Sequence, residues 1–428
     1  MKAIVLAAGK SSRFWPLAQA GHKSTYRVGY GRPVIDYTLE DLGRIGIKEV
    51  KVVRAMSDPY MTACLRAHTS SHKNAVMNIS ALDQAGATGM GDAVLAAENF
   101  LSDLGEYEQF LVLNASQINI NEIVKKLNNL NKPWPCHIMF GQKTDHPENF
   151  GVMRVREDGR VLEVKEKPNV FLSQIRIVGV YILTKSFLKE LKKHSGETSL
   201  EDALQSFVKD HGIIQAVILP SEMPLFSLKY PWDLLGVNRY LLGQNSPFNE
   251  VHPSVRIGGG AQIDGYRVVI QKDVRIYENA VIKGPCFIDE GAMIGDHTTV
   301  RDHCYIGKNV VVGAHCEVKN SILYNNVQLH HNFVGDSILD EDCSLGAGTI
   351  TANKRLDRKN VKSLVVKEGE LVKHDSGLRG LGVIMGSNVK TGINVSLMPG
   401  VKIGSGSTIY PGVVVKKSVP DGSFCESS

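Results

Sequence analysis

The chain lacks any apolar run long enough to span a membrane, and it carries little net charge. Its 428 residues include 49 basic and 44 acidic side chains, a formal net charge of +5. A net charge this close to zero argues against a protein that binds nucleic acids or membrane surfaces. It is compatible with small anionic ligands. The opening apolar stretch is interrupted by Gly9 and Lys10 and is too short for a secretory signal peptide. We expect neither nucleic acid nor membrane as a partner.

Cysteine is scarce, and no segment is of low complexity. Seven cysteines are an odd number, which does not suit a disulfide framework. Cys286, Cys304 and Cys316 recur at positions of the repeat described below where a small core side chain is needed. We therefore expect packed, reduced thiols and a cytoplasmic protein. The length allows two or three domains, each with an ample core.

The second half of the chain repeats an aliphatic residue at every sixth position. This period fits neither a helix nor a two-sided strand and predicts a left-handed parallel β-helix of hexapeptide repeats, three hexads to a coil. The position two residues before each aliphatic residue is small, as a tight corner requires. Segment 321–391 breaks the register, and irregular coils are where sites are usually built. The unbroken series is Ile270, Ile276, Ile282, Ile288, Ile294, Val300, Ile306, Val312 and Val318.

The first half alternates short apolar strands with helical patterns. This rhythm predicts a Rossmann-like α/β domain with a mostly parallel sheet, and ligands at the carboxyl ends of its strands. A polar turn at 243–247 follows the last helix, so we place the α/β domain at 1–245 and the β-helix at 250–428. The expected strands are 3–7, 50–53 and 110–113, and the expected helices are 34–45, 92–101 and 232–242.

A small-residue loop at 6–17 directly follows the first strand. Its backbone amides could line a phosphate chain, and Arg13 would add positive charge. Further motifs follow in order: Lys23, Gly-Arg-Pro at 31–33, Gly-Met-Gly-Asp at 89–92, Phe-Gly-Val at 150–152, Glu-Lys-Pro at 166–168, Gly-Val-Tyr at 179–181 and Pro-Trp-Asp at 231–233. Together the series resembles the sugar-1-phosphate nucleotidylyltransferases across the whole first half.

The resemblance implies a binding role for eight residues. Arg13 and Lys23 would neutralise the triphosphate and the sugar phosphate while the latter attacks the α-phosphorus, since phosphoryl transfer depends on positioning and charge stabilisation. The other six are Gly9 in the loop, Gln84 and Gly89 at the base, and Gly151, Glu166 and Gly179 at the sugar.

The sequence departs from that family where the family holds its divalent metal. Ser116 and Ser227 stand at the places of the two metal carboxylates. Neutral hydroxyls bind Mg²⁺ weakly, and losing a metal that contributes several kcal/mol lowers a rate by roughly 10²- to 10⁵-fold. A shifted carboxylate such as Asp92 is the alternative ligand. We therefore assign no metal ligand and expect poor transfer by a first half that still binds.

The irregular segment carries a second set of motifs, at 329–337, 345–362 and 385–394. They resemble the acetyltransferase half of the bifunctional N-acetylglucosamine-1-phosphate enzymes, especially archaeal ones. The resemblance implies that His330 takes a proton from the amine of an amino-sugar phosphate, which then attacks acetyl-CoA. Histidine suits this role because its ordinary pKa is about 6.5. His331 is the second candidate, and a surface turn histidine is the plain alternative.

The same resemblance implies the substrate contacts and the assembly. Asn353, Lys359 and Lys362 would bind the amino-sugar phosphate, and backbone groups near Gly386 and Ser387 would meet the CoA chain. β-Helices of this family form trimers with sites at the interfaces.

Three functions fit these patterns. The first is a transferase whose acetyltransferase half is intact and whose nucleotidyl-transfer half is impaired, with the fully active bifunctional enzyme as a variant. The second is a regulatory subunit that binds sugar nucleotides and pairs with an active homologue. The third is a scaffold like the nucleotidylyltransferase-like subunits of a translation-initiation exchange factor, which has no evident need for His330 or Lys359.

Overall fold

The computed structural model describes the chain except for residues 18–20, 72–76, 87, 130–136, 211, 245–248, 368–369 and 427–428. The chain forms two compact units, the first from residues 1–10, 20–25 and 33–227, and the second from 11–19, 26–32 and 228–428. Two short segments from the start of the chain therefore belong to the second unit. Part of the polar turn expected at 243–247 lies outside the described residues.

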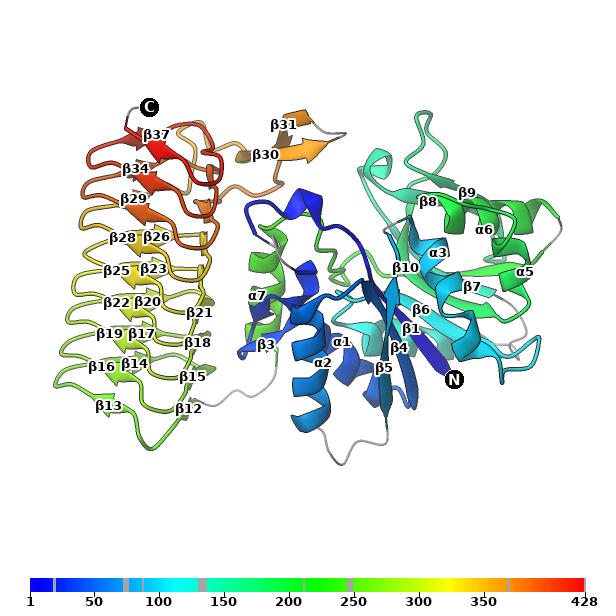
Figure 1. Cartoon of the computed structure of the whole chain (residues 1–428), viewed down its shortest axis with the longest axis horizontal. Helices are drawn as coiled ribbons and strands as arrows, with labels where there is room; N and C mark the ends of the chain where they lie inside the picture. Colours follow the sequence, from blue (N-terminus) through cyan, green and yellow to red (C-terminus); the bar gives the residue numbers. More distant parts are fainter. Residues whose placement is uncertain are drawn as a thin grey trace. The chain divides into compact units, whose positions relative to one another are not determined.

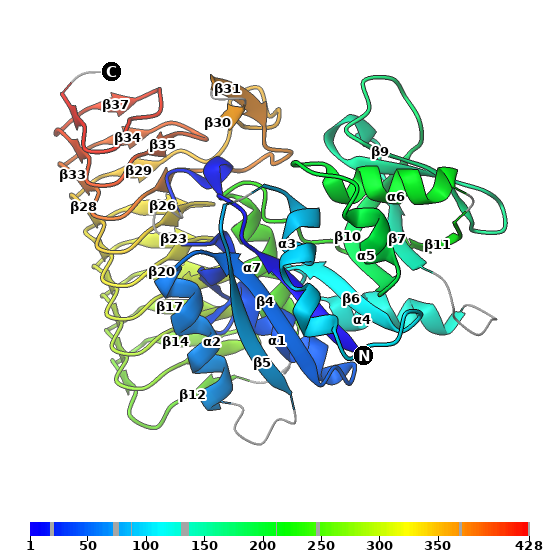
Figure 2. The ribbon, with the colours of Figure 1, turned by 45° about the vertical axis from the view of Figure 1, so that its right-hand side comes forward.

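The first unit is built on a nine-stranded sheet (Figures 1 and 2). Its main path runs β11-β7-β10-β6-β1-β4-β5, with β8 paired to β10 and β9 to β8. Along this path only β10 runs against its neighbours, so the predicted mostly parallel sheet is confirmed. The strands are β1 (Lys2–Ala7), β4 (Glu49–Ala55), β5 (Asn78–Gln84), β6 (Gln109–Asn114), β7 (His137–Lys143), β8 (Gly151–Val155), β9 (Val161–Glu166), β10 (Ile175–Thr184) and β11 (Ile214–Leu219).

Helices cover both faces of this sheet because its strands are apolar on both sides. In β1, Ile4 and Leu6 pack against α3, α5 and α6, while Ala3 and Val5 face the core shared with α1, α2 and α4. Buried parallel strands typically read as such continuous apolar runs. The helices are α1 (Val34–Arg44), α2 (Pro59–Ser71), α3 (Met90–Ala96), α4 (Ile120–Lys125), α5 (Phe187–Leu191) and α6 (Ser199–Lys209).

The single helix predicted at 92–101 is divided in two. After α3 the chain tightens into a 3₁₀-helix, η3 (Glu98–Leu101), where Phe100 N–H donates to the carbonyl of Ala97. A 3₁₀ turn shifts the side-chain positions relative to an α-helix, and here it buries Leu101 in the core beside Val94. The apolar pattern predicted one helix because it could not distinguish the two helix types.

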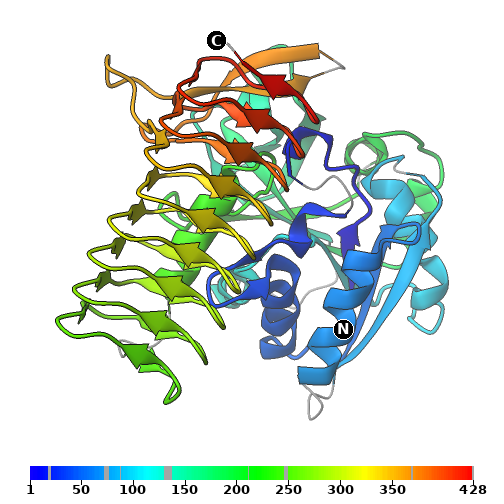
Figure 3. The same ribbon diagram turned by 60° about the vertical axis from the view of Figure 1, so that its left-hand side comes forward.

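The second unit contains the predicted β-helix, whose coils form three parallel sheets (Figure 3). The first sheet holds β12 (Glu250–Val251), β15 (Val268–Ile270), β18 (Cys286–Ile288), β21 (Cys304–Ile306), β24 (Ile322–Leu323), β27 (Ile338–Leu339), β32 (Ile384–Met385) and β35 (Lys402–Ile403). The second holds β13 (Arg256–Ile257), β16 (Arg275–Ile276), β19 (Met293–Ile294), β22 (Val311–Val312), β25 (Gln328–Leu329), β28 (Ser344–Leu345), β33 (Lys390–Thr391), β36 (Thr408–Ile409) and β38 (Phe424–Cys425). The third holds β14 (Gln262–Asp264), β17 (Val281–Lys283), β20 (Thr299–Arg301), β23 (Glu317–Lys319), β26 (Phe333–Gly335), β29 (Ile350–Thr351), β34 (Ser396–Leu397) and β37 (Val414–Val415).

The sixfold aliphatic series points into the prism as predicted. Every member is at most 2% exposed, and the small residues two positions earlier are buried at the corners. The residue before a corner often adopts a left-handed conformation, which asparagine, aspartate and histidine tolerate better than most side chains. Examples are Asp273, Asn279, His297, Asn309, His315, Asn326 and Asp342, with φ between 54° and 61°.

The irregular segment of the β-helix changes the length of its coils. Residues paired on the first sheet lie 18 positions apart from Phe287 to Tyr305, then 17 to Ile322 and 16 to Ile338. The next step, from Ile338 to Ile384, is 46 residues long. The extra length includes an antiparallel hairpin of β30 (Lys362–Lys367) and β31 (Glu370–Asp375).

The first sheet of the β-helix is apolar on its outer face too. On each coil of this sheet one side chain points outward, and these side chains lie in register; we call them the outward ladder. The six apolar members of the outward ladder are at most 8% exposed. Segment 26–32 and α7 (Asp233–Gly243) cover this face within the same unit. The centroids of the Tyr30 and Phe287 rings lie 6.4 Å apart. The Asn238 side chain accepts a hydrogen bond from Gly29 N–H and donates one to the carbonyl of His303, each at 2.8 Å. The ladder consists of Val269, Phe287, Tyr305, Ile322, Ile338 and Ile384, and it continues into Lys402.

Neighbouring residues of β17 offer a matched test of the aliphatic stack. Ile282 is fully buried, whereas Lys283 is exposed. We expect Ile282→Ala to lower the free energy of unfolding by about 2–5 kcal/mol through lost burial and a residual cavity. Lys283→Ala should change it by less than about 0.5 kcal/mol. Denaturant titration of both full-length variants measures the difference, and equal effects would contradict the inward placement.

Candidate functional site

The sheet of the first unit has a topological switch point at the carboxyl end of β1. From β1 the chain continues to β4 on one side, while β6, later in sequence, pairs on the other. Parallel α/β sheets bind ligands at such a switch point, outside the carboxyl ends of the strands. Gly9 follows β1 here and Asn114 ends β6, with Leu6 directly opposite Asn114. A Cβ atom on Gly9 would meet no atom within 4 Å, so there is space beside this position.

The residues predicted to face the sugar are brought together on the β8–β9 hairpin and β10. Gly151 is the register partner of Glu166, and a Cβ at Gly151 would lie 2.6 Å from Glu166 Oε2. Gly179 has φ 76°, and a Cβ there would lie 2.8 Å from Asn114 Nδ2. Close packing thus accounts for both glycines before any ligand is considered.

The two residues predicted to face the base lie on different elements of this unit. Gln84 is buried at the end of β5, and Gly89 immediately precedes α3. Gly89 has φ 136°, and a Cβ there would overlap the carbonyl oxygen of Gly196. A side chain is therefore excluded at Gly89 by the backbone of the α5–α6 connection.

The two predicted phosphate cations lie in different units. Lys23 begins η2 (Lys23–Thr25) in the first unit, beside His22, whose pKa is lowered to about 3 by burial and then by the charge of Lys23. Arg13 lies on η1 (Ser12–Phe14), which packs in the second unit. There burial raises the pKa of Tyr230, and the charge and hydrogen bond of Arg13 act in the opposite direction. Arg13 therefore lies near the phenol of Tyr230.

Glu201 is a buried carboxyl that sequence patterns did not identify. It lies near the start of α6, and its pKa is raised to about 7, first by burial and then by the charge of Glu166. A buried carboxyl with a raised pKa is a candidate for a functional site, whereas Glu166 is partly exposed and lies 3.1 Å from Lys167 Nζ. A single Glu near the polar start of a helix is common, so the sequence did not indicate that Glu201 would lie near Glu166.

The two positions at which the resemblance places metal carboxylates are Ser116 and Ser227, and they differ in exposure. Ser116 is 6% exposed just after β6, whereas Ser227 is exposed. Within the described residues, no group of three or more His, Cys, Asp or Glu side chains is arranged to hold a metal ion. The donors at these two places are thus neutral, and they do not suit Mg²⁺.

In the second unit, His330 lies exposed at the corner after β25. Its backbone N–H donates to Asn332 Oδ1 at 2.5 Å. The buried Asn332 amide in turn donates to the carbonyls of Gly346, at 2.9 Å, and Thr349, at 3.1 Å. The histidine turn is therefore fixed to the Gly-Ala-Gly-Thr stretch, while His331, with φ 53°, occupies the left-handed corner position.

Asn353 is held by a buried carboxylate. Asp336, 6% exposed, accepts one hydrogen bond from the Asn353 amide and another from Asn320, each at 2.5 Å. This network fixes the chain where it leaves β29 for the inserted hairpin. The amide nitrogen of Asn353 is thus engaged by Asp336, and its predicted contact with an amino sugar stays a prediction.

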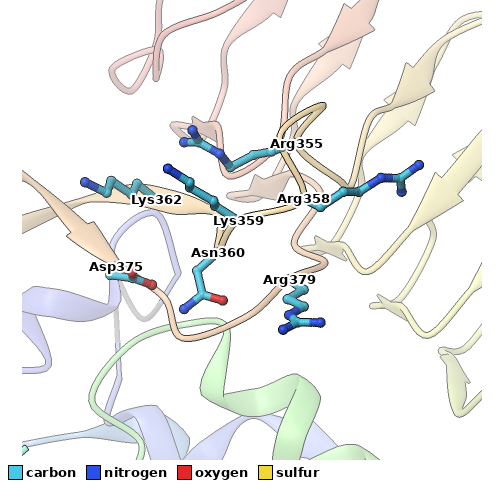
Figure 4. Close-up of a pocket in the computed structure, with 7 residues that line it drawn as sticks. All are labelled: Arg355, Arg358, Lys359, Asn360, Lys362, Asp375 and Arg379. Carbon is cyan, nitrogen blue, oxygen red and sulfur yellow. The ribbon is translucent and has the colours of Figure 1, made fainter.

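The long insertion forms a cation-lined cavity of about 520 Å³ (Figure 4). Lys359 and Lys362, both predicted to bind phosphate, line it together, whereas His330 and Asn353 do not. Three arginines add to its positive charge, and sequence reasoning did not select them because isolated surface arginines are common. The lining is Arg355, Arg358, Lys359, Asn360, Lys362, Asp375 and Arg379.

The predicted CoA contacts lie on the coil after the hairpin. A Cβ on Gly386 would meet the carbonyl oxygen of Pro16 at 3.0 Å and would overlap Ser405 Oγ. Ser387 Oγ lies 3.5 Å from that same serine hydroxyl. Close packing inside the second unit therefore explains Gly386 by itself.

An α/β unit with a mostly parallel sheet, followed by a hexapeptide β-helix with a cation-lined pocket on its insertion, is typical of a two-part transferase. The Nucleotidyl transferase family model matches residues 2–223, the GMPPB C-terminal domain model residues 282–375, and the bacterial transferase hexapeptide model residues 382–417. The chain belongs to the family of bifunctional sugar-1-phosphate nucleotidylyltransferase/acetyltransferases.

Two relatives are similar over nearly the full length. The bifunctional sugar-1-phosphate nucleotidylyltransferase/acetyltransferase of Sulfurisphaera tokodaii is 32% identical over 99% of both chains. The bifunctional protein GlmU of Methanocaldococcus jannaschii is 31% identical over 99% of this chain and 97% of its own. A glucose-1-phosphate thymidylyltransferase of Streptomyces antibioticus is 28% identical over 69% of this chain and 80% of its own. Among the described residues, no helix is long and apolar enough to cross a membrane.

The cavity predicts a measurable affinity for inorganic phosphate. Replacing Lys359 or Arg379 by Met should weaken phosphate binding by about tenfold or more at low ionic strength, because a hydrogen bond to a charged group contributes about 1.5–3 kcal/mol. Lys373→Met is the matched control, since Lys373 is exposed on the same hairpin but does not line the cavity. Calorimetric titration measures the three constants, and an equal loss in the control would indicate only a general charge effect.

Proposed function

We propose that the β-helix half transfers the acetyl group of acetyl-CoA to the amine of an amino-sugar-1-phosphate of the glucosamine-1-phosphate type. The observation that carries the proposal is the fixed turn of His330, tied through Asn332 to the Gly346–Thr349 stretch. The cation-lined cavity of the neighbouring insertion adds the charge that a sugar phosphate requires. Full-length similarity to bifunctional relatives supports the same assignment.

In the proposed reaction, His330 acts as general base. Its imidazole accepts a proton from the substrate amine as the nitrogen attacks the thioester carbonyl carbon, the C–S bond breaks, and the CoA thiolate leaves and takes up a proton. Lys359 and Lys362 neutralise the sugar phosphate, and Asn353 contacts the amino sugar. Backbone groups near Gly386 and Ser387 hold the CoA chain.

We expect His330→Ala to reduce acetyl transfer to glucosamine-1-phosphate by roughly 10²- to 10⁴-fold, because the reaction loses its general base. CoA binding should be nearly unchanged, since the base is not needed to hold the thioester. Product formation by mass spectrometry and CoA titration measure the two effects.

His331→Asn is the control for this experiment. Asparagine tolerates the left-handed conformation at position 331, so the turn should be kept and the rate largely preserved. A His330→Ala enzyme that kept more than half of the rate would show that His330 is not the base.

We further propose that the first half binds a nucleoside triphosphate, a sugar-1-phosphate or a sugar nucleotide but transfers nucleotidyl groups poorly. The charges of Arg13 and Lys23 and the switch point of the parallel sheet support binding. The neutral hydroxyls of Ser116 and Ser227 support weak transfer, because they do not suit the Mg²⁺ that this chemistry uses. The identity of Ser116 and Ser227 also favours the second candidate, a regulatory subunit that pairs with an active homologue.

Restoring the two carboxylates tests this proposal. Ser116→Asp with Ser227→Asp should raise Mg²⁺-dependent nucleotidyl transfer by on the order of 10²-fold if a few kcal/mol of metal stabilisation return. Either change alone should do less. Rates are measured with glucose-1-phosphate, glucosamine-1-phosphate and its N-acetyl product against a panel of triphosphates. Ser116→Asn with Ser227→Asn is the uncharged control, and efficient transfer by the unmodified chain would overturn the proposal.

We propose a homotrimer or a higher assembly in the cytoplasm. Hexapeptide-repeat proteins usually form trimers. Cys286, Cys304, Cys316 and Cys343 are buried in the β-helix as small core side chains, which is compatible with a reducing compartment.

A further inference from the structure

The loop that carries Arg13 is attached to the last coils of the β-helix. Residues 11–19 pack in the second unit, where the indole N–H of Trp15 lies 3.2 Å from both carboxylate oxygens of Asp421. The carbonyl oxygen of Trp15 accepts a hydrogen bond of 2.9 Å from Lys402 Nζ. Two residues after Arg13, the loop is thus held by both its backbone and its side chain.

Lys402 holds this loop from an unusual position. It continues the outward ladder after Ile384 and is only 1% exposed. Its amine lies 5.8 Å from the ring centroid of Trp15 and 5.2 Å from that of Trp232, both within cation–π range. Burial lowers its pKa to about 7, so the protonated amine is costly here. An aliphatic residue would suit the outward ladder better if the amine made no specific interaction.

Aromatic rings extend these contacts toward the cation-lined cavity. Trp232 stacks on Tyr230 at 4.6 Å, and the ring of His374 lies 4.7 Å from that of Tyr230. Tyr230 is the residue that lies near Arg13. His374 lies on β31, next to Asp375 of the cavity lining. Arg13 is therefore linked to the rest of the second unit in two ways: through Tyr230, whose ring meets that of His374, and through its own loop.

We propose that Lys402 is a positioning residue for the phosphate loop: its hydrogen bond to the Trp15 carbonyl fixes the turn that presents Arg13. The β-helix then sets how tightly the loop holds a polyphosphate. This inference rests on the proposed nucleotide binding by the first half. The alternative is that Lys402 only fills space between the two indoles. Its replacement would then destabilise the whole coil and not the loop in particular.

The first test measures the loop itself in the full-length chain. Lys402→Met keeps a long side chain that fits the apolar ladder but removes the donor. We expect amide hydrogen exchange in residues 12–17 to rise by about tenfold, because the hydrogen bond from the Lys402 amine to the Trp15 carbonyl is lost. Exchange in the central coils, 286–345, should stay unchanged. Lys390→Met, on an exposed outward position of β33, is the matched control and should leave the loop as it is.

The second test measures tripolyphosphate affinity by calorimetry. Lys402→Met and Arg13→Ala should each weaken binding by about tenfold, and the double variant should lose little more than Arg13→Ala alone, because Lys402 acts through that side chain. Fully additive losses, unchanged loop exchange, or exchange that rises equally throughout the β-helix would each overturn the positioning role. If the unmodified chain binds neither tripolyphosphate nor any nucleoside triphosphate, the proposed nucleotide function fails, and the exchange result still decides whether Lys402 fixes the loop.

Discussion

One sheet of the β-helix must bury both of its faces. The inward residues fill the prism, and the outward ladder from Val269 to Ile384 needs a cover as well. Each fully buried large aliphatic or aromatic side chain contributes about 1.5–3 kcal/mol relative to exposure, so leaving six of them in water would be costly. Segment 26–32 and α7 provide this cover within the second unit. The division of the chain into compact units follows from this burial and not from a single linker.

Several glycines at the proposed ligand sites also have structural causes. Gly89, Gly179 and Gly386 each lie against backbone or side-chain atoms that leave no room for a Cβ, and the first two have positive φ. A glycine that matches a family motif can therefore reflect close packing of the scaffold as much as contact with a ligand. The stronger signs of a site here are charged: the buried Glu201 beside Glu166, and the cations gathered on the hairpin insertion.

The insertion explains why the irregular coils carry chemistry. A regular hexapeptide coil presents short strands with few long polar side chains, and its corners are tight. Shortened coils and a step of 46 residues between Ile338 and Ile384 allow a loop and a hairpin to leave the prism. That excursion gathers five basic side chains that a uniform β-helix would have spread along its height. The fixed His330 turn lies in the shortened coils just before it.

The sequence alone determined the local periodicities, because those depend on neighbours along the chain. The sixfold aliphatic register specified the β-helix and its inward residues, and the alternation of apolar strands with helical patterns specified a mostly parallel α/β sheet. The resemblance selected Lys359 and Lys362, which line the same pocket, and their binding of phosphate stays a prediction. Tertiary structure decided what depends on partners distant in sequence. The outward ladder was visible as apolar residues such as Phe287 and Tyr305, yet nothing local showed that residues 26–32 would cover them. The pairing of Glu166 with Glu201, the arginines of the cavity, and the burial of Lys402 beside Trp15 and Trp232 likewise arise only when separate segments pack together, since burial and charge proximity are properties of the folded chain.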